Sequence, residues 1–304
     1  MEILKNVCRA CSAGCGVNVL IENDKILKIE GNPDYPTNKG GLCARGVAAA
    51  GVIYAPDRIL HPLKRVGIKG EGKWEQISWD EAIDTVAKRL LEIKSTYGPK
   101  SLAFMCGQQW HFGVANLLHD RFHSAVLGTP NWGGHGHMCS GPNSAANAMV
   151  YGESNGARPA LLGHIDYPDY PCKCMVLWGA NPFTSRSARS DKILDWKEHG
   201  AKFIVIDPYL SSAAQKADIW LQNKPDTDVP LALSMANVII AEGLYDKDFV
   251  EKWVYGFDKF KDYTEQYHPK KAEIITDVPA EKTYIAAASG LVLVSLTYRR
   301  SILI

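Results

Sequence analysis

Residues 175–208 read MVLWGANPFTSRSARSDKILDWKEHGAKFIVIDP, and this stretch holds two short apolar runs with a helical pattern between them. Met175–Trp178 and Phe203–Ile206 are rich in residues that favour strands, and each run ends at a turn-forming group. The pattern over Ala188–His199 has helical spacing and is stopped by Gly200. A strand, a helix and a second strand in this order predict a parallel sheet covered by helices.

The same alternation continues on both sides of this stretch. Ser78 and Glu81 form a capping box, and an amphipathic helical pattern follows it as far as Tyr97. A further helical pattern covers Val229–Glu242 and ends at Gly243. We therefore expect an α/β fold in which a small N-terminal domain with β-hairpins precedes layered α/β domains with largely parallel sheets.

The composition is that of an ordinary globular protein with room for about two domains: 304 residues, 46% hydrophobic, 22% charged and a formal net charge of +1. The near-neutral charge argues against a general nucleic-acid or membrane-surface binder. The first residues do not resemble an export signal, and the apolar uncharged run Tyr284–Tyr298 is shorter than the roughly 20 residues of a membrane-spanning helix. We expect a cytoplasmic chain with no nucleic-acid partner and no membrane span.

Half of the eight cysteines lie near the N-terminus, at Cys8, Cys11, Cys15 and Cys43. The β-rich runs 17–21 and 25–29 predict a hairpin that folds back over the first three. Thiolate sets of this kind hold iron–sulfur clusters or zinc. The spacing favours a [4Fe–4S] cluster, because structural zinc sites usually pair two Cys-x2-4-Cys knuckles and Cys43 stands alone; zinc and unliganded thiols remain the alternatives. Three other cysteines fit no motif and are expected to be structural: Cys106, Cys172 and Cys174.

Several blocks of the chain resemble, in order and spacing, the opening of the molybdopterin oxidoreductases of the dimethyl-sulfoxide-reductase type. The blocks are CRACSAGCGV (8–17), GLCARG (41–46), DRILHPLK (57–64) and WEQISWDEA (74–82). The resemblance runs from about residue 5 to about residue 288. It implies a [4Fe–4S] cluster on the four N-terminal cysteines and a bis(molybdopterin guanine dinucleotide) cofactor that holds molybdenum or tungsten.

The resemblance also implies roles for single residues. Arg45 matches a basic residue that lies between cluster and pterin and helps electrons to pass; the alternative for Arg45 is a solvated surface cation. In the block NWGGHGHMCSGPN (131–143), Cys139 matches the residue that binds the metal, and His135 and His137 become candidates for the substrate pocket. Without the resemblance, Cys139 would be a small buried hydrophobe and the two histidines hydrogen-bonded loop residues.

Three polar residues at strand ends or helix starts resemble the family's contacts to the guanosine end of one pterin dinucleotide: Asn181, Asp207 and Asp228. Turns after parallel strands are where such sheets bind nucleotides, and Asp228 also suits a helix cap. The chain departs from the family pattern at Tyr209-Leu210, where basic residues are common, and at Asp226, where glycine is common. These departures weaken the expected phosphate contacts.

The resemblance predicts four regions. They are an iron–sulfur domain at 1–62, an α/β domain with the metal-ligand loop at 63–170, an α/β domain that binds the dinucleotide at 171–288, and an atypical tail at 289–304 that does not read as a continued helix. No stretch corresponds to the family's C-terminal domain. We expect a fragment of the family's catalytic subunit.

Three functions stay open. The first is a redox enzyme fragment that passes electrons between a small-molecule substrate at the pterin-bound metal and the cluster, with an electron-transfer subunit as a possible partner. The second is a non-redox tungsten hydratase of the acetylene hydratase kind, although Ser12 stands where that hydratase has an acidic residue. The third is a non-catalytic iron–sulfur electron-transfer remnant.

Overall fold

A computed structural model describes residues 1–11, 13–106, 115–134, 140–152, 172–185 and 190–298. The chain divides into two compact units, which are described one at a time. The first joins Met1–Ile53 to Ala160–Ile304, and the second is Tyr54–Pro159.

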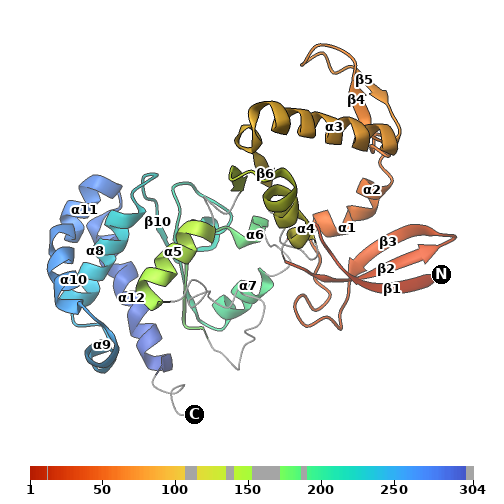
Figure 1. Ribbon diagram of the computed structural model, residues 1–304. Coiled ribbons are helices and arrows are strands. Elements are labelled where there is room, and N and C mark those ends of the chain that lie inside the picture. The colour runs from red at the N-terminus through yellow and green to blue at the C-terminus, as the bar shows by residue number, and fades with distance from the viewer. Residues whose placement is uncertain (12, 107–114, 135–139, 153–171, 186–189, 299–304) are drawn as a thin grey trace. The chain divides into compact units, whose positions relative to one another are not determined.

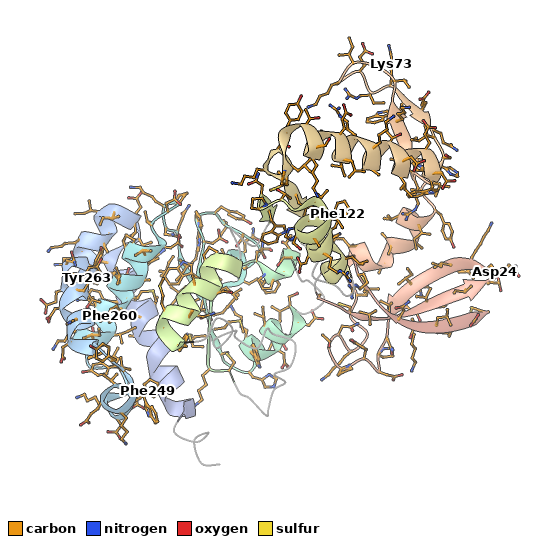
Figure 2. The ribbon with its side chains drawn as sticks, viewed as in Figure 1. Asp24, Lys73, Phe122, Phe249, Phe260 and Tyr263 are labelled. Atoms are coloured by element: carbon orange, nitrogen blue, oxygen red, sulfur yellow. The ribbon has the colours of Figure 1, made fainter. Side chains whose placement is uncertain are left out.

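The first unit begins with an antiparallel sheet of three strands, β1 (Glu2–Val7), β2 (Gly16–Glu22) and β3 (Lys25–Gly31). Strands β2 and β3 form the hairpin that the sequence predicted. Their two-residue turn is Asn23-Asp24, and Asp24 lies at its tip (Figure 2). Both residues have positive φ, 50° and 61°, and Asn and Asp tolerate this left-handed backbone in tight hairpin turns. Two short helices follow the sheet, α1 (Ala44–Val47) and α2 (Ala49–Ile53).

The same unit contains a parallel sheet in the order β8-β9-β10, with β8 at Cys174–Trp178, β9 at Lys202–Ile206 and β10 at Ile219–Leu221. The connections include α6 (Pro182–Ser185), α7 (Asp191–Glu198) and the 3-10 turn η6 (Ala214–Lys216). This arrangement confirms the expected parallel α/β layering. The helix expected over 188–199 begins at Asp191, and residues 186–189 lie outside the described part of the chain.

A helical layer completes this unit: α8 (Asp228–Ala241), α9 (Lys247–Trp253), α10 (Phe257–Thr264), η7 (Glu265–Tyr267), α11 (Pro269–Thr276) and α12 (Ala280–Tyr298). Helices α11 and α12 pack on α8, and α12 also contacts all three strands (Figure 1).

The core explains the layers. The β9 residues Phe203–Ile206 are at most 2% exposed, and alternate side chains face opposite sides. Phe203 and Val205 pack with Trp196 of α7, whereas Ile204 and Ile206 pack with Leu231 of α8. A fully buried side chain of this size contributes roughly 1.5–3 kcal/mol, so the central strand anchors both helical layers.

One expectation about the tail was wrong. We expected the chain after residue 288 not to continue a helix, but α12 runs on to Tyr298. A helix that is already formed gains one hydrogen bond for each residue added, so the single Gly290 does not end it.

The second unit contains two pairs of strands and a long helix. Strands β4 (Leu63–Arg65) and β5 (Trp74–Gln76) pair antiparallel, and β6 (Phe104–Cys106) and β7 (Trp132–Gly134) pair parallel. The remaining elements of the unit are α3 (Trp79–Tyr97), η1 (Pro99–Ser101), α4 (Ala115–Arg121), the π-helical η3 (Phe122–Leu127) and α5 (Ser140–Tyr151).

Helix α3 confirms the capping box and the amphipathic pattern. Ser78 Oγ accepts a hydrogen bond from the Glu81 amide at 3.1 Å, and the chain turns away at Gly98, whose φ is 80°. No residue of α3 is buried. Among the described helices of the whole chain, none is long and apolar enough to cross a membrane.

Candidate functional site

The first three cysteines lie on the connection between β1 and β2. The Cys8 amide donates to the Cys15 carbonyl at 2.8 Å, directly beyond the last strand pair, Val7 with Gly16. Within this loop Gly14 has φ 62°, and the Ala13 amide donates to Cys11 Sγ at 3.4 Å. Sheet pairing therefore closes the loop that carries the three cysteines.

Asn38 ties the Cys43 segment to this loop. Its side chain is 7% exposed, accepts from the Gly16 amide at 2.7 Å and donates to the carbonyls of Gly16 and Gly41 at 3.1 and 2.7 Å. The segment that contains Tyr35 and Asn38 can pack closely against Gly16 because Gly16 has no side chain. A Cβ at Gly16 would lie 2.1 Å from the Tyr35 ring. Cys43 follows two residues after Gly41, and sequence reasoning did not identify Asn38 as the residue that anchors it.

The donor set fits an iron–sulfur cluster. The four sulfurs are not in disulfide bonds, and Cys15 is buried whereas the other three cysteines are half-buried. Thiolates are the ligands that such clusters use, and the segments that carry them are held together by backbone and Asn38 contacts. In the part of the chain that the structure describes, no three His, Cys, Asp or Glu side chains converge closely enough to hold one metal ion.

Arg45 links the cysteine region to the turn after β8. It lies on α1, two residues after Cys43, and its Nη2 donates to the carbonyls of Thr184 and Ser185 at 3.4 and 3.2 Å. These carbonyls end the short helix α6, where a cation is favourable because the last carbonyls of a helix carry partial negative charge. Arg45 also lines, with Cys8, an apolar cavity of about 790 Å³ between the sheet and α1–α2. The side chain thus bridges two parts of the first unit.

Asn181 lies in a polar cluster beyond the carboxyl end of β8. Its Nδ2 donates to Thr184 Oγ1 at 3.1 Å, and its Oδ1 accepts from Ser212 Oγ at 3.0 Å. The preceding Gly179 has φ 56°, and its amide donates to the Ile206 carbonyl of β9 at 2.9 Å. Glycine accommodates this left-handed backbone, which brings Asn181 to the edge where β9 also ends.

Asp207 follows β9 directly and is 4% exposed. Its Oδ1 accepts from the Tyr209 amide at 3.2 Å, and its backbone carbonyl accepts from Trp220 Nε1 at 2.9 Å. One carboxylate oxygen is thus used by the local turn. The strand and Trp220 fix the backbone that carries the carboxylate.

Asp228 is the first residue of α8, and the structure corrects its interpretation as a helix cap. The N-cap residue is Thr227, whose hydroxyl donates to the Lys224 carbonyl at 2.7 Å. Asp228 Oδ1 instead accepts from Trp178 Nε1 at 2.5 Å. Trp178 ends β8, so this hydrogen bond brings the start of α8 beside the strand ends. A negative charge in the first turn of a helix is itself favourable.

Asp226 explains one departure from the expected pattern. Its φ is 64°, a left-handed conformation in which glycine is the commonest residue. Asp is among the few other residues that adopt it at modest cost. The loop conformation is therefore accessible without the glycine.

The loop expected to carry the metal ligand lies outside the described residues. Cys139, His135 and His137 lie outside the described residues, as does Ser12. Strand β7 ends at Gly134, immediately before this loop, and α5 begins at Ser140, immediately after it. The side chain of Cys106, the last residue of β6, also lies outside the described part.

Cys172 and Cys174 behave as structural residues. Cys172 packs against the cluster that contains Trp196, and Cys174 against the cluster that contains Leu231. Burial raises the pKa of both thiols, that of Cys174 to about 11. At neutral pH both are protonated, which suits packing and opposes metal binding.

Sequence reasoning therefore named Asn181, Asp207 and Asp228, and the structure brings the elements that carry them to one edge of the β8–β10 sheet. It missed the residues that orient them, Trp178, Ser212 and Trp220. Trp178 alone carried a signal, because it stands at a strand end directly before a glycine turn.

We compared the chain with known protein families and proteins. The molybdopterin oxidoreductase family matches residues 58–299, and the molybdopterin oxidoreductase Fe4S4 domain matches residues 1–55.

Acetylene hydratase of Syntrophotalea acetylenica is 35% identical over 292 residues, which cover 92% of this chain and 37% of that protein. The molybdopterin-containing subunit of thiosulfate reductase of Salmonella typhimurium is 33% identical (91% of this chain, 35% of that protein), as is formate dehydrogenase H of Escherichia coli (94% and 39%). The solved structure of acetylene hydratase from Pelobacter acetylenicus superposes with a TM-score of 0.74 at 32% identity, over 93% of this chain and 38% of that one. The chain spans less than two fifths of the length of these relatives.

Proposed function

Because the chain belongs to the molybdopterin oxidoreductase family, with the family's Fe4S4 domain at its N-terminus, we propose that it forms the cluster-binding and nucleotide-binding part of the catalytic subunit of a molybdenum or tungsten oxidoreductase. Electrons pass in this proposal between a small-molecule substrate at the pterin-bound metal and a [4Fe–4S] cluster. An electron-transfer subunit is the proposed partner. The relatives include both reductases and dehydrogenases, so the direction of transfer stays open.

The observation that carries the proposal is the position of Arg45. Its guanidinium joins the helix that follows Cys43 to the turn that carries Asn181. A fixed cation between a cluster site and a dinucleotide site lowers the energy of an electron as it moves between them, because positive charge stabilises the reduced state. Arg45 is exposed, and what separates it from a surface cation without partners is its pair of hydrogen bonds to the last carbonyls of α6.

The cluster and the dinucleotide, when bound, supply the redox chemistry, and the chain's own residues hold them. We assign the cluster to the four N-terminal thiolates and the guanosine end of one pterin to three side chains of the strand edge, Asn181, Asp207 and Asp228. Carboxylates accept from ribose hydroxyls and from guanine N–H groups. The bis(molybdopterin guanine dinucleotide) form of the cofactor is part of this proposal. The second dinucleotide would be held by a region like the one that the longer relatives have beyond the part matched here.

Cys139 is the proposed metal ligand, and His135 and His137 are the proposed pocket residues. The thiolate would complete the coordination of molybdenum or tungsten, and imidazoles can hold or release a proton near neutral pH. The domain boundaries at residues 62, 170 and 288 belong to the same proposal.

A non-redox hydratase is the second candidate, and the similarity to acetylene hydratase favours it in sequence and structure. The residue after Cys11 argues against it, because Ser12 cannot supply a carboxylic proton to an adding water. Hydration of acetylene by the tungsten-loaded protein with Ser12 unchanged would raise this candidate above the first.

The test is metal and pterin analysis after anaerobic purification from a host that makes the cofactor. We expect about four irons per chain, molybdenum or tungsten, and fluorescent pterin after acid release. Cys15→Ser should lose iron, whereas the matched control Cys172→Ser, in a cysteine with no ligand role, should keep it. Zinc without visible colour would overturn the cluster assignment, and iron without pterin would favour the electron-transfer remnant.

A further inference from the structure

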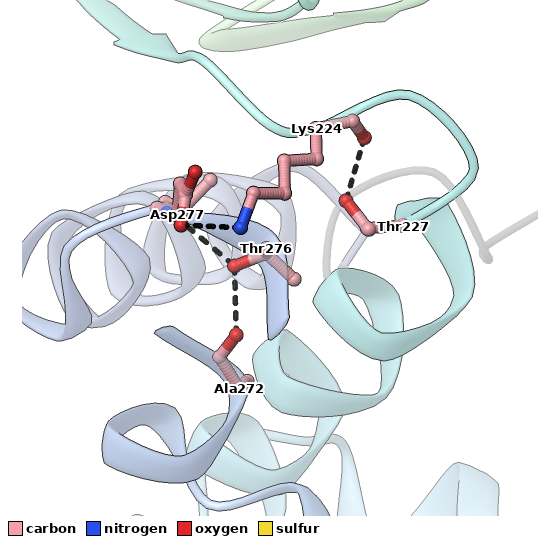
Figure 3. Close-up of polar contacts among 6 residues, drawn as sticks. Lys224, Thr227, Ala272, Thr276 and Asp277 are labelled. Carbon is pink, nitrogen blue, oxygen red and sulfur yellow. Dashed lines mark hydrogen bonds and ion pairs between the residues drawn. The ribbon is translucent and has the colours of Figure 1, made fainter. Parts of the chain in front are cut away.

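The loop between β10 and α8 is fastened to the junction of α11 and α12. The Lys224 amide donates to the Thr276 carbonyl at 2.9 Å, and Lys224 Nζ pairs with Asp277 Oδ1 at 2.8 Å (Figure 3). One residue of the loop is thus bound to the junction by both backbone and side chain.

The junction is a firm anchor. Thr276 and Val278 are 0% and 1% exposed, and Val278 belongs to the core cluster of Leu231. Thr276 Oγ1 donates to the Ala272 carbonyl at 2.9 Å and accepts from the Val278 amide at 3.2 Å (Figure 3). Between these two buried residues Asp277 turns outward with φ 60°, so its carboxylate projects from a backbone that the core holds in place.

Lys224 passes this constraint to the start of α8. Its carbonyl accepts from Thr227 Oγ1 at 2.7 Å and from Asn223 Nδ2 at 3.1 Å. Asn223 is 3% exposed, and Thr227 is the N-cap directly before Asp228. The path from the anchor to Asp228 therefore runs through the backbone hydrogen bond and salt bridge of Lys224, and then through the hydrogen bond of the Thr227 hydroxyl to the Lys224 carbonyl.

We propose that Lys224 and Asp277 are positioning residues that hold Asp228 in the orientation in which it accepts from the guanosine end of the dinucleotide. This inference rests on the proposed role of Asp228. We call the Lys224–Asp277 pair the clamp. Trp178 holds Asp228 from the other side, so the clamp and the indole together fix the carboxylate. Without the salt bridge, the loop keeps the backbone hydrogen bond from Lys224 to Thr276, and Asp226, with its positive φ, should relax more readily toward commoner backbone conformations.

The salt bridge is half-exposed, with side chains 50% and 61% accessible. Such pairs contribute modestly and are screened by salt, so its loss should weaken binding only about two- to fivefold. This exposure also supplies a signature: a ligand without charge should bind less tightly at high salt only while the clamp is intact.

The test uses guanosine as the probe, because it lacks phosphate, and measures its dissociation constant with the purified chain by ligand-observed NMR at low and high salt. The variants are Lys224→Met, which keeps the length of the side chain, and Asp277→Asn, which keeps a residue that tolerates positive φ. A matched control is Lys5→Met, which breaks another exposed pair, that of Lys5 with Asp34 in the N-terminal sheet region.

We expect each variant to bind guanosine about two- to fivefold more weakly at low salt, the double variant to be no worse than either, and wild-type affinity to fall toward the variants at high salt. Unchanged affinity in the variants, or losses that add, would overturn the clamp while leaving the proposed function standing. No binding of guanosine by the wild-type chain, with adenosine as a comparison, would overturn the assigned nucleotide site and the clamp with it.

Discussion

Asn38→Ala should destabilise the cysteine region and release the cluster. The side chain makes three hydrogen bonds in a buried position, two to Gly16 and one to Gly41. At about 1 kcal/mol for each bond, the loss is about 3 kcal/mol. The Gly16 amide would also be left buried without a partner, whereas the Gly16 carbonyl still accepts from the Asn32 amide at 2.9 Å. A loss of this size is a large part of the roughly 5–15 kcal/mol that stabilises a domain.

The assay is urea unfolding of the anaerobically purified chain, followed by the visible absorption of the cluster and by protein iron. Asn6→Ala is the matched control, because Asn6 Oδ1 accepts one local, exposed hydrogen bond from the Val7 amide. We expect Asn38→Ala to lose iron at a lower urea concentration than wild type and the control to match wild type. Equal stability and equal iron in Asn38→Ala and wild type would refute the reasoning that Asn38 anchors the Cys43 segment.

Three further changes test other parts of the account. Arg45→Met should keep its iron but retain less pterin, because the link from α1 to the β8 turn is lost; equal pterin fluorescence in variant and wild type would contradict the bridge. Asp226→Ala should lower the free energy of unfolding by about 1 kcal/mol, since alanine pays the left-handed cost, whereas Asp226→Gly should not; chemical denaturation measures both, and equal losses would argue against strain at this residue. The Cys174 thiol has a pKa of about 11 against an ordinary 9.0 because burial disfavours the thiolate. The unfolded chain therefore releases this proton first, and stability should fall as pH rises from about 9 toward 11; Cys174→Ala should show a shallower fall, and identical pH profiles would exclude the effect.

Local patterns in the sequence predicted much of the fold. The Ser78–Glu81 capping box located the start of α3, and the apolar run Phe203–Ile206 located the central strand of the parallel sheet. Both signals are short-range, because neighbouring residues determine a helix cap and the apolar pattern of a buried strand. The β2–β3 hairpin followed in the same way, from two β-rich runs separated by the turn-forming residues 22–24.

Tertiary contacts were harder to foresee. Asn38 anchors the Cys43 loop and Trp178 holds Asp228, but both act across more than twenty residues of chain. The sequence shows an asparagine in a polar loop and a tryptophan at a strand end, and neither pattern specifies its partner. The helix cap placed at Asp228 belongs to Thr227 for a related reason: both residues suit an N-cap, and the contact of Asp228 with Trp178 distinguishes them.

Helix α3 shows a different limit. Its pattern correctly predicted an amphipathic helix, yet Ile83 and Val86 are 60% and 58% exposed. Periodicity indicates which face is apolar, and it does not say which segment covers that face.

The most direct measurement of the central claim is the low-temperature electron paramagnetic resonance spectrum of the anaerobically purified chain after reduction with dithionite, with iron determined on the same sample. We expect about four irons per chain and the signal of a reduced [4Fe–4S] cluster, both lost in Cys8→Ser and Cys43→Ser and kept in Cys172→Ser. A chain that holds zinc, or one that keeps its cluster signal without Cys43, would contradict the account.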